Sequence, residues 1–109
     1  MKHPQALIEN RDLHFEISEV QVVPIKPANG LVGFASLVVN RSLFLGSIAI
    51  MSRPGGGYRL LYPNKKLGNT IIDMFHPINR SAADILEDVI LAKFEDVMNK
   101  AAGFEHIPA

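Results

Sequence analysis

The 109-residue sequence contains no cysteine and no tryptophan, and only 7% of its residues are aromatic. Without cysteine, the chain cannot form disulfide bonds, thiolate metal sites or a cysteine nucleophile. Long hydrophobic runs are also missing, because no segment approaches the roughly 20 apolar residues that a membrane-spanning helix needs. The apolar run from Ala6 to Ile8 is too short for the core of a signal peptide. We therefore expect a cytoplasmic protein that does not interact with membranes.

Residues that commonly bind metals or catalyse reactions occur only in isolation. The four histidines, His3, His14, His76 and His106, include no pair separated by three or four residues. Because a zinc site needs three or four convergent ligands, we expect no metal, and we interpret His76 as a turn residue whose ring bonds a nearby backbone group. The serines occur in no Gly-x-Ser-x-Gly or Ser-x-x-Lys motif. We predict that the protein is not an enzyme and uses neither a cofactor nor a small-molecule substrate.

A single glycine-rich segment, Gly55-Gly56-Gly57, invites comparison with phosphate-binding loops. A P-loop, however, places its glycines before a Lys-Ser/Thr pair and a helix. Here the glycines precede Tyr58-Arg59 and a strand-like pattern. We therefore predict a hairpin loop, whose flexibility would let Arg53 and Arg59 adapt to a partner.

Length and composition predict one domain. A chain of this size with 48% hydrophobic residues can form one modest core. We place the domain at residues 15–103, after a polar N-terminal arm at 1–14 and before a short tail at 104–109. Because the core is small and the predicted strands are rich in Val, Ile and Leu, we expect a homodimer.

Strand signals follow one another closely in the first two thirds of the chain. Asn29-Gly30 predicts a tight hairpin, since both residues tolerate positive φ. Pro24 and Pro27 either restrict the strand before this turn to an edge or interrupt it, and Gly46 predicts that a later strand is weakened or bulged. The predicted strands are Phe15–Val23, Leu31–Val39, Leu43–Met51, Tyr58–Tyr62 and Thr70–Met74. The fold class that follows is α+β, with an antiparallel meander of four to five strands and one C-terminal helix.

The helix is predicted from Ser81 to Ala101. An apolar stripe recurs there at helical spacing, formed by Leu86, Val89, Ile90, Phe94, Val97 and Met98. Asn79 and Ser81 are both suitable N-caps, and Ser81 with Asp84 fits a capping box. Gly103 is the expected C-terminal stop.

Positive charge is concentrated in the middle of the chain, although the net charge is zero. Residues 41–80 contain six Lys and Arg residues against one Asp, whereas residues 81–109 contain two against six Asp and Glu. Lys65 and Lys66 lie in a predicted turn, and Arg80 precedes a helix whose N-terminal N–H groups attract phosphate. This pattern indicates either a nucleic-acid contact surface or a solvated surface that only improves solubility.

Two neighbouring segments resemble the SpoVG family (stage V sporulation protein G, the septation protein). Tyr62-Pro63-Asn64-Lys65-Lys66, a short loop, the segment Ile71–Asn79 and the helical segment Ser81–Val97 follow in the order typical of that family. The resemblance covers roughly Ile17 to Met98. Its most specific part is His76-Pro77-Ile78-Asn79.

This resemblance implies a SpoVG-like sheet and helix, assembled as a homodimer through strand contacts. SpoVG proteins are small bacterial regulators that bind DNA or RNA and influence sporulation septation, so the resemblance implies nucleic acid as a partner here. Contacts would come from the basic turn and the first helical turn. The implied nucleic-acid-binding residues are Lys65, Lys66, Arg80 and Ser81, with Arg53 and Arg59 as auxiliaries.

The sequence departs from the family pattern directly after Ser81. Where the resemblance implies polar and basic residues, this chain has Ala82, Ala83, Asp84 and Ile85. Fewer cations and one added anion weaken phosphate binding. The alternative hypothesis is a non-enzymatic protein–protein adaptor that retains the SpoVG scaffold without binding nucleic acid, with its acidic helix face and Gly-rich loop as contacts.

Overall fold

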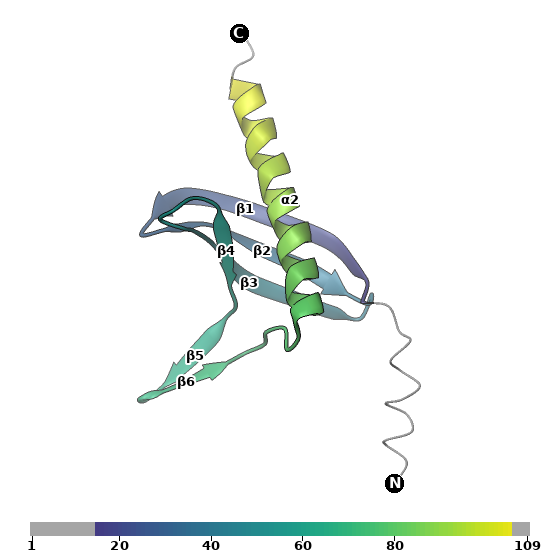
Figure 1. Cartoon of the computed structure of the whole chain (residues 1–109), viewed down its shortest axis with the longest axis vertical. Coiled ribbons are helices and arrows are strands. Elements are labelled where there is room, and N and C mark those ends of the chain that lie inside the picture. The colour runs from purple at the N-terminus through teal and green to yellow at the C-terminus, as the bar shows by residue number, and fades with distance from the viewer. Residues whose placement is uncertain (1–14, 106–109) are drawn as a thin grey trace.

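The chain forms a four-stranded antiparallel sheet, a separate two-stranded hairpin and one long helix (Figure 1). The computed structural model describes residues 15–105, and only the backbone of residues 102–105. The predicted N-terminal arm at 1–14 and residues 106–109 of the predicted C-terminal tail lie outside the described residues. The elements are β1 (Ile17–Ala28), β2 (Leu31–Val39), β3 (Leu43–Ser52), β4 (Tyr58–Leu61), β5 (Asn64–Leu67), β6 (Thr70–Asp73) and α2 (Arg80–Glu105). The predicted α+β class is confirmed.

The main sheet is a meander in which the strand order follows the sequence, β1-β2-β3-β4. Asn29 and Gly30 connect β1 to β2 with φ of 54° and 89°, which confirms the predicted hairpin. β1 is an edge strand that contains Pro24 and Pro27. An edge position tolerates these prolines because not every N–H of an edge strand is needed for pairing. The β2–β3 register shifts next to Gly46, where Ser47 has φ of 61°, in agreement with the predicted bulge.

The hydrophobic core lies between the sheet and α2, which crosses one face of the sheet (Figure 1). Side chains of a strand alternate between its two faces, so every second residue of β2 points toward the helix. The helix buries Leu86, Ile90 and Phe94 at four-residue intervals, which agrees with the first part of the predicted stripe, whereas Met98 at its end is 43% exposed. The buried core consists of Ala35, Leu37, Val39, Ile48, Ile50, Leu86, Ile90 and Phe94. On the opposite face of the sheet, Val23 and Phe34 are exposed cross-strand partners.

Asn79 is the N-cap of α2, which begins at Arg80. The Asn79 Oδ1 atom accepts a hydrogen bond of 2.8 Å from the Ala82 N–H. Ser81 already lies in the helix, so the prediction of a capping box from Ser81 and Asp84 is wrong. The reason is positional: Asn79 reaches the free N–H groups of the first turn before Ser81 can do so.

The helix also ends later than expected. The predicted stop at Gly103 is wrong, because α2 continues to Glu105. A single glycine weakens a helix by about 1 kcal/mol relative to alanine, which is not enough to end it. Within the described range 15–105, no helix has the combination of length and apolar character needed to cross a membrane.

The β5–β6 hairpin projects from the body of the molecule, and we call residues 64–73 the arm (Figure 1). The turn predicted around Lys65 and Lys66 is wrong, since both residues lie in β5 and pair with β6. The predicted fifth strand at Thr70–Met74 exists as β6, but it pairs with β5 instead of extending the main sheet. The tight turn falls at Gly68, whose φ is 62°. Pairing within the arm satisfies the backbone groups of each strand that face the other strand.

Candidate nucleic-acid interface

The turn between β6 and α2 separates two depressions on the surface. Pro77, Ile78 and Asn79 line both depressions and form the wall between them. The first depression, which we call the arginine cleft, has a volume of about 660 Å³ and lies between β4 and the first turns of α2. It is lined by Arg53, Arg59, Leu60, Tyr62, Pro77, Ile78, Asn79, Arg80, Ala83, Asp84 and Glu87.

Three of the predicted cations meet at this cleft. Arg53 and Arg59 come from the β3–β4 connection and from β4, and Arg80 is the first residue of α2. The connection is closed by two hydrogen bonds of 3.0 Å, from the Arg53 N–H to the Gly57 carbonyl and from the Gly56 N–H to the Arg53 carbonyl. Gly56 and Gly57 have φ of 108° and 79°, a conformation that favours glycine. The glycine-rich segment is therefore a hairpin loop, as predicted, and it places Arg53 at the cleft.

Within the described residues, the three cleft arginines make no ion pair shorter than 4.0 Å. The ion pairs among the described residues lie elsewhere and join Glu16 to Arg41, Asp73 to His76 and Asp96 to Lys100. Asp84 and Glu87 nevertheless line the same cleft. Three positive and two negative side chains leave a small positive charge, to which the N-terminal end of the helix dipole adds.

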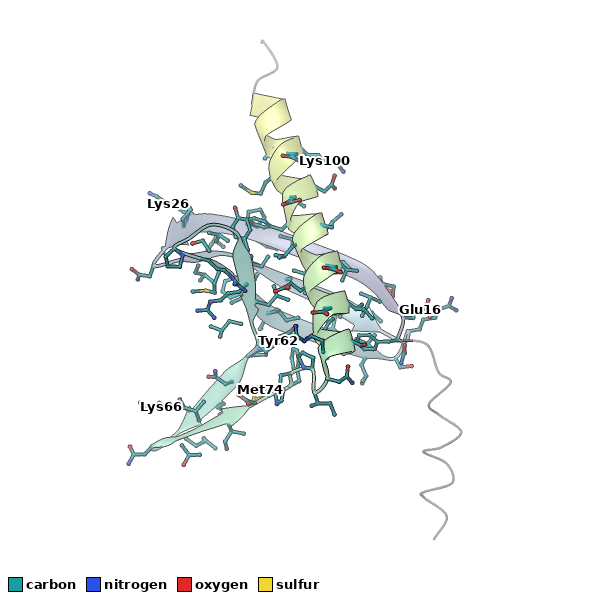
Figure 2. All side chains as sticks on the ribbon, viewed as in Figure 1. Glu16, Lys26, Tyr62, Lys66, Met74 and Lys100 are labelled. Carbon is teal, nitrogen blue, oxygen red and sulfur yellow. The ribbon has the colours of Figure 1, made fainter. Side chains whose placement is uncertain are left out.

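The other predicted binding residues lie away from the arginine cleft. Lys65 and Lys66 are exposed on the arm, and they point to opposite faces because they are consecutive residues of a strand. Figure 2 shows Lys66 near the end of the arm, far from the helix. Ser81 lines the second depression. The structure thus brings Arg53, Arg59 and Arg80 together and separates them from the remaining three.

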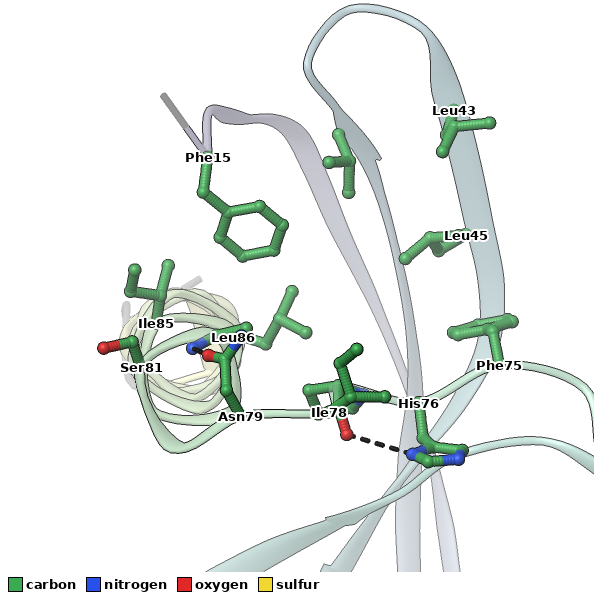
Figure 3. A pocket seen from close by; sticks show the side chains of 13 residues that line it. Phe15, Leu43, Leu45, Phe75, His76, Ile78, Asn79, Ser81, Ile85 and Leu86 are labelled. Atoms are coloured by element: carbon green, nitrogen blue, oxygen red, sulfur yellow. Dashed lines mark hydrogen bonds between the residues drawn. The ribbon is translucent and has the colours of Figure 1, made fainter. Parts of the chain in front are cut away.

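The second depression, which we call the apolar groove, has a volume of about 640 Å³ (Figure 3). Its walls come from the start of β3, the segment after β6 and the first turns of α2. It is lined by Phe15, Val39, Leu43, Leu45, Phe75, His76, Pro77, Ile78, Asn79, Ser81, Ala82, Ile85 and Leu86. Side chains that would normally be buried are exposed here, and Ile78 is the extreme case at 87%.

His76 lies at the edge of the apolar groove (Figure 3). Its Nδ1 atom donates a hydrogen bond of 2.9 Å to the Pro77 carbonyl, which is the backbone contact predicted for this ring. Its Nε2 atom lies 3.7 Å from an Asp73 carboxylate oxygen. In the part of the chain that the structure describes, no group of three His, Asp or Glu residues is arranged to hold a metal ion.

Comparison with known proteins identifies the family. The model of the SpoVG family matches residues 15–96 of this sequence. The chain belongs to the SpoVG family. A protein of Phytoplasma australiense that carries the name septation protein SpoVG is 26% identical over 84 residues, which cover 77% of this chain and 88% of that protein. The resemblance inferred from the His-Pro-Ile-Asn segment and its neighbours is therefore confirmed.

Sequence reasoning did not identify all residues of the cleft in this SpoVG protein. Tyr62 and Glu87 face the arginines although they are separated by 25 positions in the chain. The apolar groove was also missed. Its only signal in the sequence is the placement of Ile78 between Pro77 and Asn79, where a turn would normally carry polar side chains.

The environment of Tyr62 in the cleft raises the pKa of its hydroxyl. Its ring packs edge-on against Phe75, with 6.1 Å between the ring centroids, and it lies between β4 and the start of α2 (Figure 2). Burial raises the pKa of the Tyr62 hydroxyl from 10.0 to about 12, and the negative charge of Glu87 adds to the increase. The hydroxyl therefore stays protonated and can donate a hydrogen bond at physiological pH.

The pKa of Tyr62 predicts how stability changes at alkaline pH. The unfolded chain loses this proton near pH 10.0, whereas the folded protein keeps it up to about pH 12. The stability contribution is therefore complete below pH 10.0 and is lost as the pH rises to about 12. We expect this loss to be about 1–2 kcal/mol, because the ring is partly exposed. Urea unfolding across this range should show the loss in the wild type and not in Tyr62→Phe; equal losses in both would contradict the assignment.

Proposed function

We propose that this SpoVG-family protein is a cytoplasmic regulator of the septation and sporulation type that binds DNA or RNA phosphates at the arginine cleft. The observation that supports the proposal is the convergence of Arg53, Arg59 and Arg80, from two separate segments, beside the N-terminus of α2. Guanidinium groups form bidentate hydrogen bonds with phosphate oxygens. Neutralising phosphates releases counterions, which drives binding.

The same chemistry determines the role of the other candidates. Lys65 and Lys66 lie on the projecting arm, where they extend the contact to a neighbouring stretch of the nucleic acid backbone. Ser81 would contact the nucleic-acid backbone only at the opposite side of the turn, because it lies at the apolar groove. No catalytic step, cofactor or small-molecule substrate is part of this function.

Asp84 and Glu87 limit the affinity of this cleft. They lie among the arginines and repel phosphate. We therefore expect weak binding that depends strongly on salt and carries little sequence specificity, because phosphate contacts do not read bases.

The apolar groove favours the second candidate function, a protein–protein adaptor. Exposed Leu43, Ile78 and Ile85 form a surface that suits another protein better than a nucleic acid. The two functions differ in one direct measurement, the binding of a labelled oligonucleotide.

Fluorescence anisotropy with single-stranded DNA, double-stranded DNA and RNA tests the proposal. We expect binding at about 50 mM salt that weakens steeply by about 200 mM, with a slope that reports the number of phosphates contacted. The slope should be similar for unrelated sequences. Absence of binding to all three ligands at the lower salt concentration would refute nucleic-acid binding and favour the adaptor.

A further inference from the structure

The two central strands of the main sheet contain no charged residue. β2 reads Leu-Val-Gly-Phe-Ala-Ser-Leu-Val-Val, and β3 reads Leu-Phe-Leu-Gly-Ser-Ile-Ala-Ile-Met-Ser. A strand with one face on the core and the other in water normally alternates apolar and polar residues, whereas a strand covered on both faces is apolar throughout. The helix α2 covers one face of this sheet (Figure 1). The composition of β2 and β3 therefore indicates that the opposite face is covered as well.

A row of apolar side chains crosses that opposite face. The row consists of Val23, Phe34, Ala49 and Leu61, one residue from each strand, and each is the cross-strand partner of the next. Cross-strand partners lie on the same side of a sheet. Because Phe34 precedes the core residue Ala35 in β2, the row faces away from α2. Its larger members are not covered by the described chain, since Val23 is 62%, Phe34 39% and Leu61 43% exposed.

A depression of about 420 Å³ lies beside this row. Phe44 lines it and is 71% exposed. Gly46 lets the Phe44 ring lie close to the backbone of β3, because a Cβ atom at this position would be 2.9 Å from the ring atom Cε2. The depression is lined by Gln21, Val23, Phe34, Ala35, Ser36, Phe44, Gly46 and Ser47, none of which is charged. We call the row and the depression together the open face.

The chemistry of the open face is self-complementary. In a two-fold assembly, residues near the axis face their own copies. A charged side chain would meet a like charge there, but neither the row nor the depression contains one. Gln21, Ser36 and Ser47 both donate and accept hydrogen bonds, so each can bond to an identical residue. Such a face suits a second copy of the chain better than a charged partner.

We propose that two copies of this chain pack the open faces of their sheets against each other, as the two layers of a β-sandwich do. Packed sheets lie about 10 Å apart with interdigitating side chains. Phe34 and Ala49 belong to the two central strands and would lie nearest the two-fold axis. The contact uses neither the arm nor the apolar groove. It is therefore additional to the homodimer through strand contacts that the family resemblance implies, and it would join two such homodimers.

The area of the open face determines how strong this contact can be. The four strands contain 12, 9, 10 and 4 residues. With about 4.8 Å between strands and about 3.3 Å per residue, they present roughly 550 Å² in each copy. Two copies together would bury roughly 1,100 Å², which exceeds the minimum of about 1,000 Å² for a biological contact but not the standard of about 1,600 Å². We therefore expect a reversible association that depends on protein concentration.

Sedimentation equilibrium on matched variants tests the proposal. We expect the average mass of the wild type to double between low and high micromolar concentration. Leu61→Glu and Val23→Glu place a charge at either end of the row, and each should keep the lower mass throughout. Met98→Glu is the control, because Met98 is 43% exposed like Leu61 but lies on α2. It should associate like the wild type, and circular dichroism checks that every variant is folded.

Cysteine cross-linking tests which faces meet and requires no disruptive substitution. The chain has no cysteine, so Ala49→Cys introduces a single thiol in the middle of the open face. A bis-maleimide reagent with a span of about 10 Å matches the spacing of packed sheets. It should join two Ala49→Cys chains into a covalent pair. Met98→Cys, with its thiol on α2, should not be joined under the same conditions.

Three outcomes would overturn the pairing of open faces. A wild-type mass equal to that of Leu61→Glu at every concentration would leave the open face to a different protein. A doubling of mass in both glutamate variants as well as in the wild type would place the association on another surface. Equal cross-linking of Ala49→Cys and Met98→Cys would show only random collision. None of these results depends on oligonucleotide binding by Arg53, Arg59 and Arg80, so the two proposals can fail separately.

Discussion

Replacing Phe94 with alanine is expected to lower the free energy of unfolding by about 3–5 kcal/mol. Phe94 is 3% exposed, and its ring packs against Tyr58 with 5.0 Å between the ring centroids. It also lies directly over Gly33, where a Cβ atom would be 3.7 Å from the Phe94 ring. The substitution removes the contact between α2 and the sheet at the centre of the core and leaves a cavity. Because small domains are stable by only about 5–15 kcal/mol, this loss is a large part of the total stability.

Urea unfolding followed by circular dichroism measures this effect. Met98→Ala is the matched control, since Met98 lies one turn later on the same helix but is 43% exposed. We expect a loss of no more than about 1 kcal/mol for the control. A loss of similar size in both variants would show that the helix does not pack on the sheet through Phe94.

Replacing Arg53, Arg59 and Arg80 together with glutamine is expected to remove most of the salt dependence of oligonucleotide binding. Three phosphate contacts contribute about −2.7 to the slope of log affinity against log salt for double-stranded DNA. Between about 50 and 200 mM salt, the wild type should therefore lose roughly 40-fold more affinity than the triple variant. The three side chains lie on the surface of the cleft, so the fold should be unaffected.

The arm lysines provide the comparison for the arginine cleft. Lys65→Ala/Lys66→Ala removes at most two phosphate contacts, which corresponds to roughly a 12-fold difference over the same salt range. Anisotropy titrations of both variants would rank the two surfaces. A triple arginine variant with the slope of the wild type would exclude the cleft as the binding site, and a large effect of the lysine pair alone would move the site to the arm.

Local rules were sufficient for most of the secondary structure. Asn29-Gly30 predicted the β1–β2 turn because few other dipeptides adopt positive φ at low cost. The periodic apolar residues predicted α2 and the side that faces the sheet. One error occurred where two local signals competed, at the helix start, where Asn79 and Ser81 were both suitable caps.

The sequence by itself determined the order of the strands, the helix and the family of this protein, because these depend on residue spacing and on a short, specific segment around His76-Pro77-Ile78-Asn79. Only the tertiary structure decided which cations share a surface. Arg53 and Arg80 meet at one cleft although 27 positions separate them, whereas Ser81 lies at the groove on the other side. Consecutive residues on a helix or strand point in different directions, so neighbours in sequence can face different sites while distant residues converge.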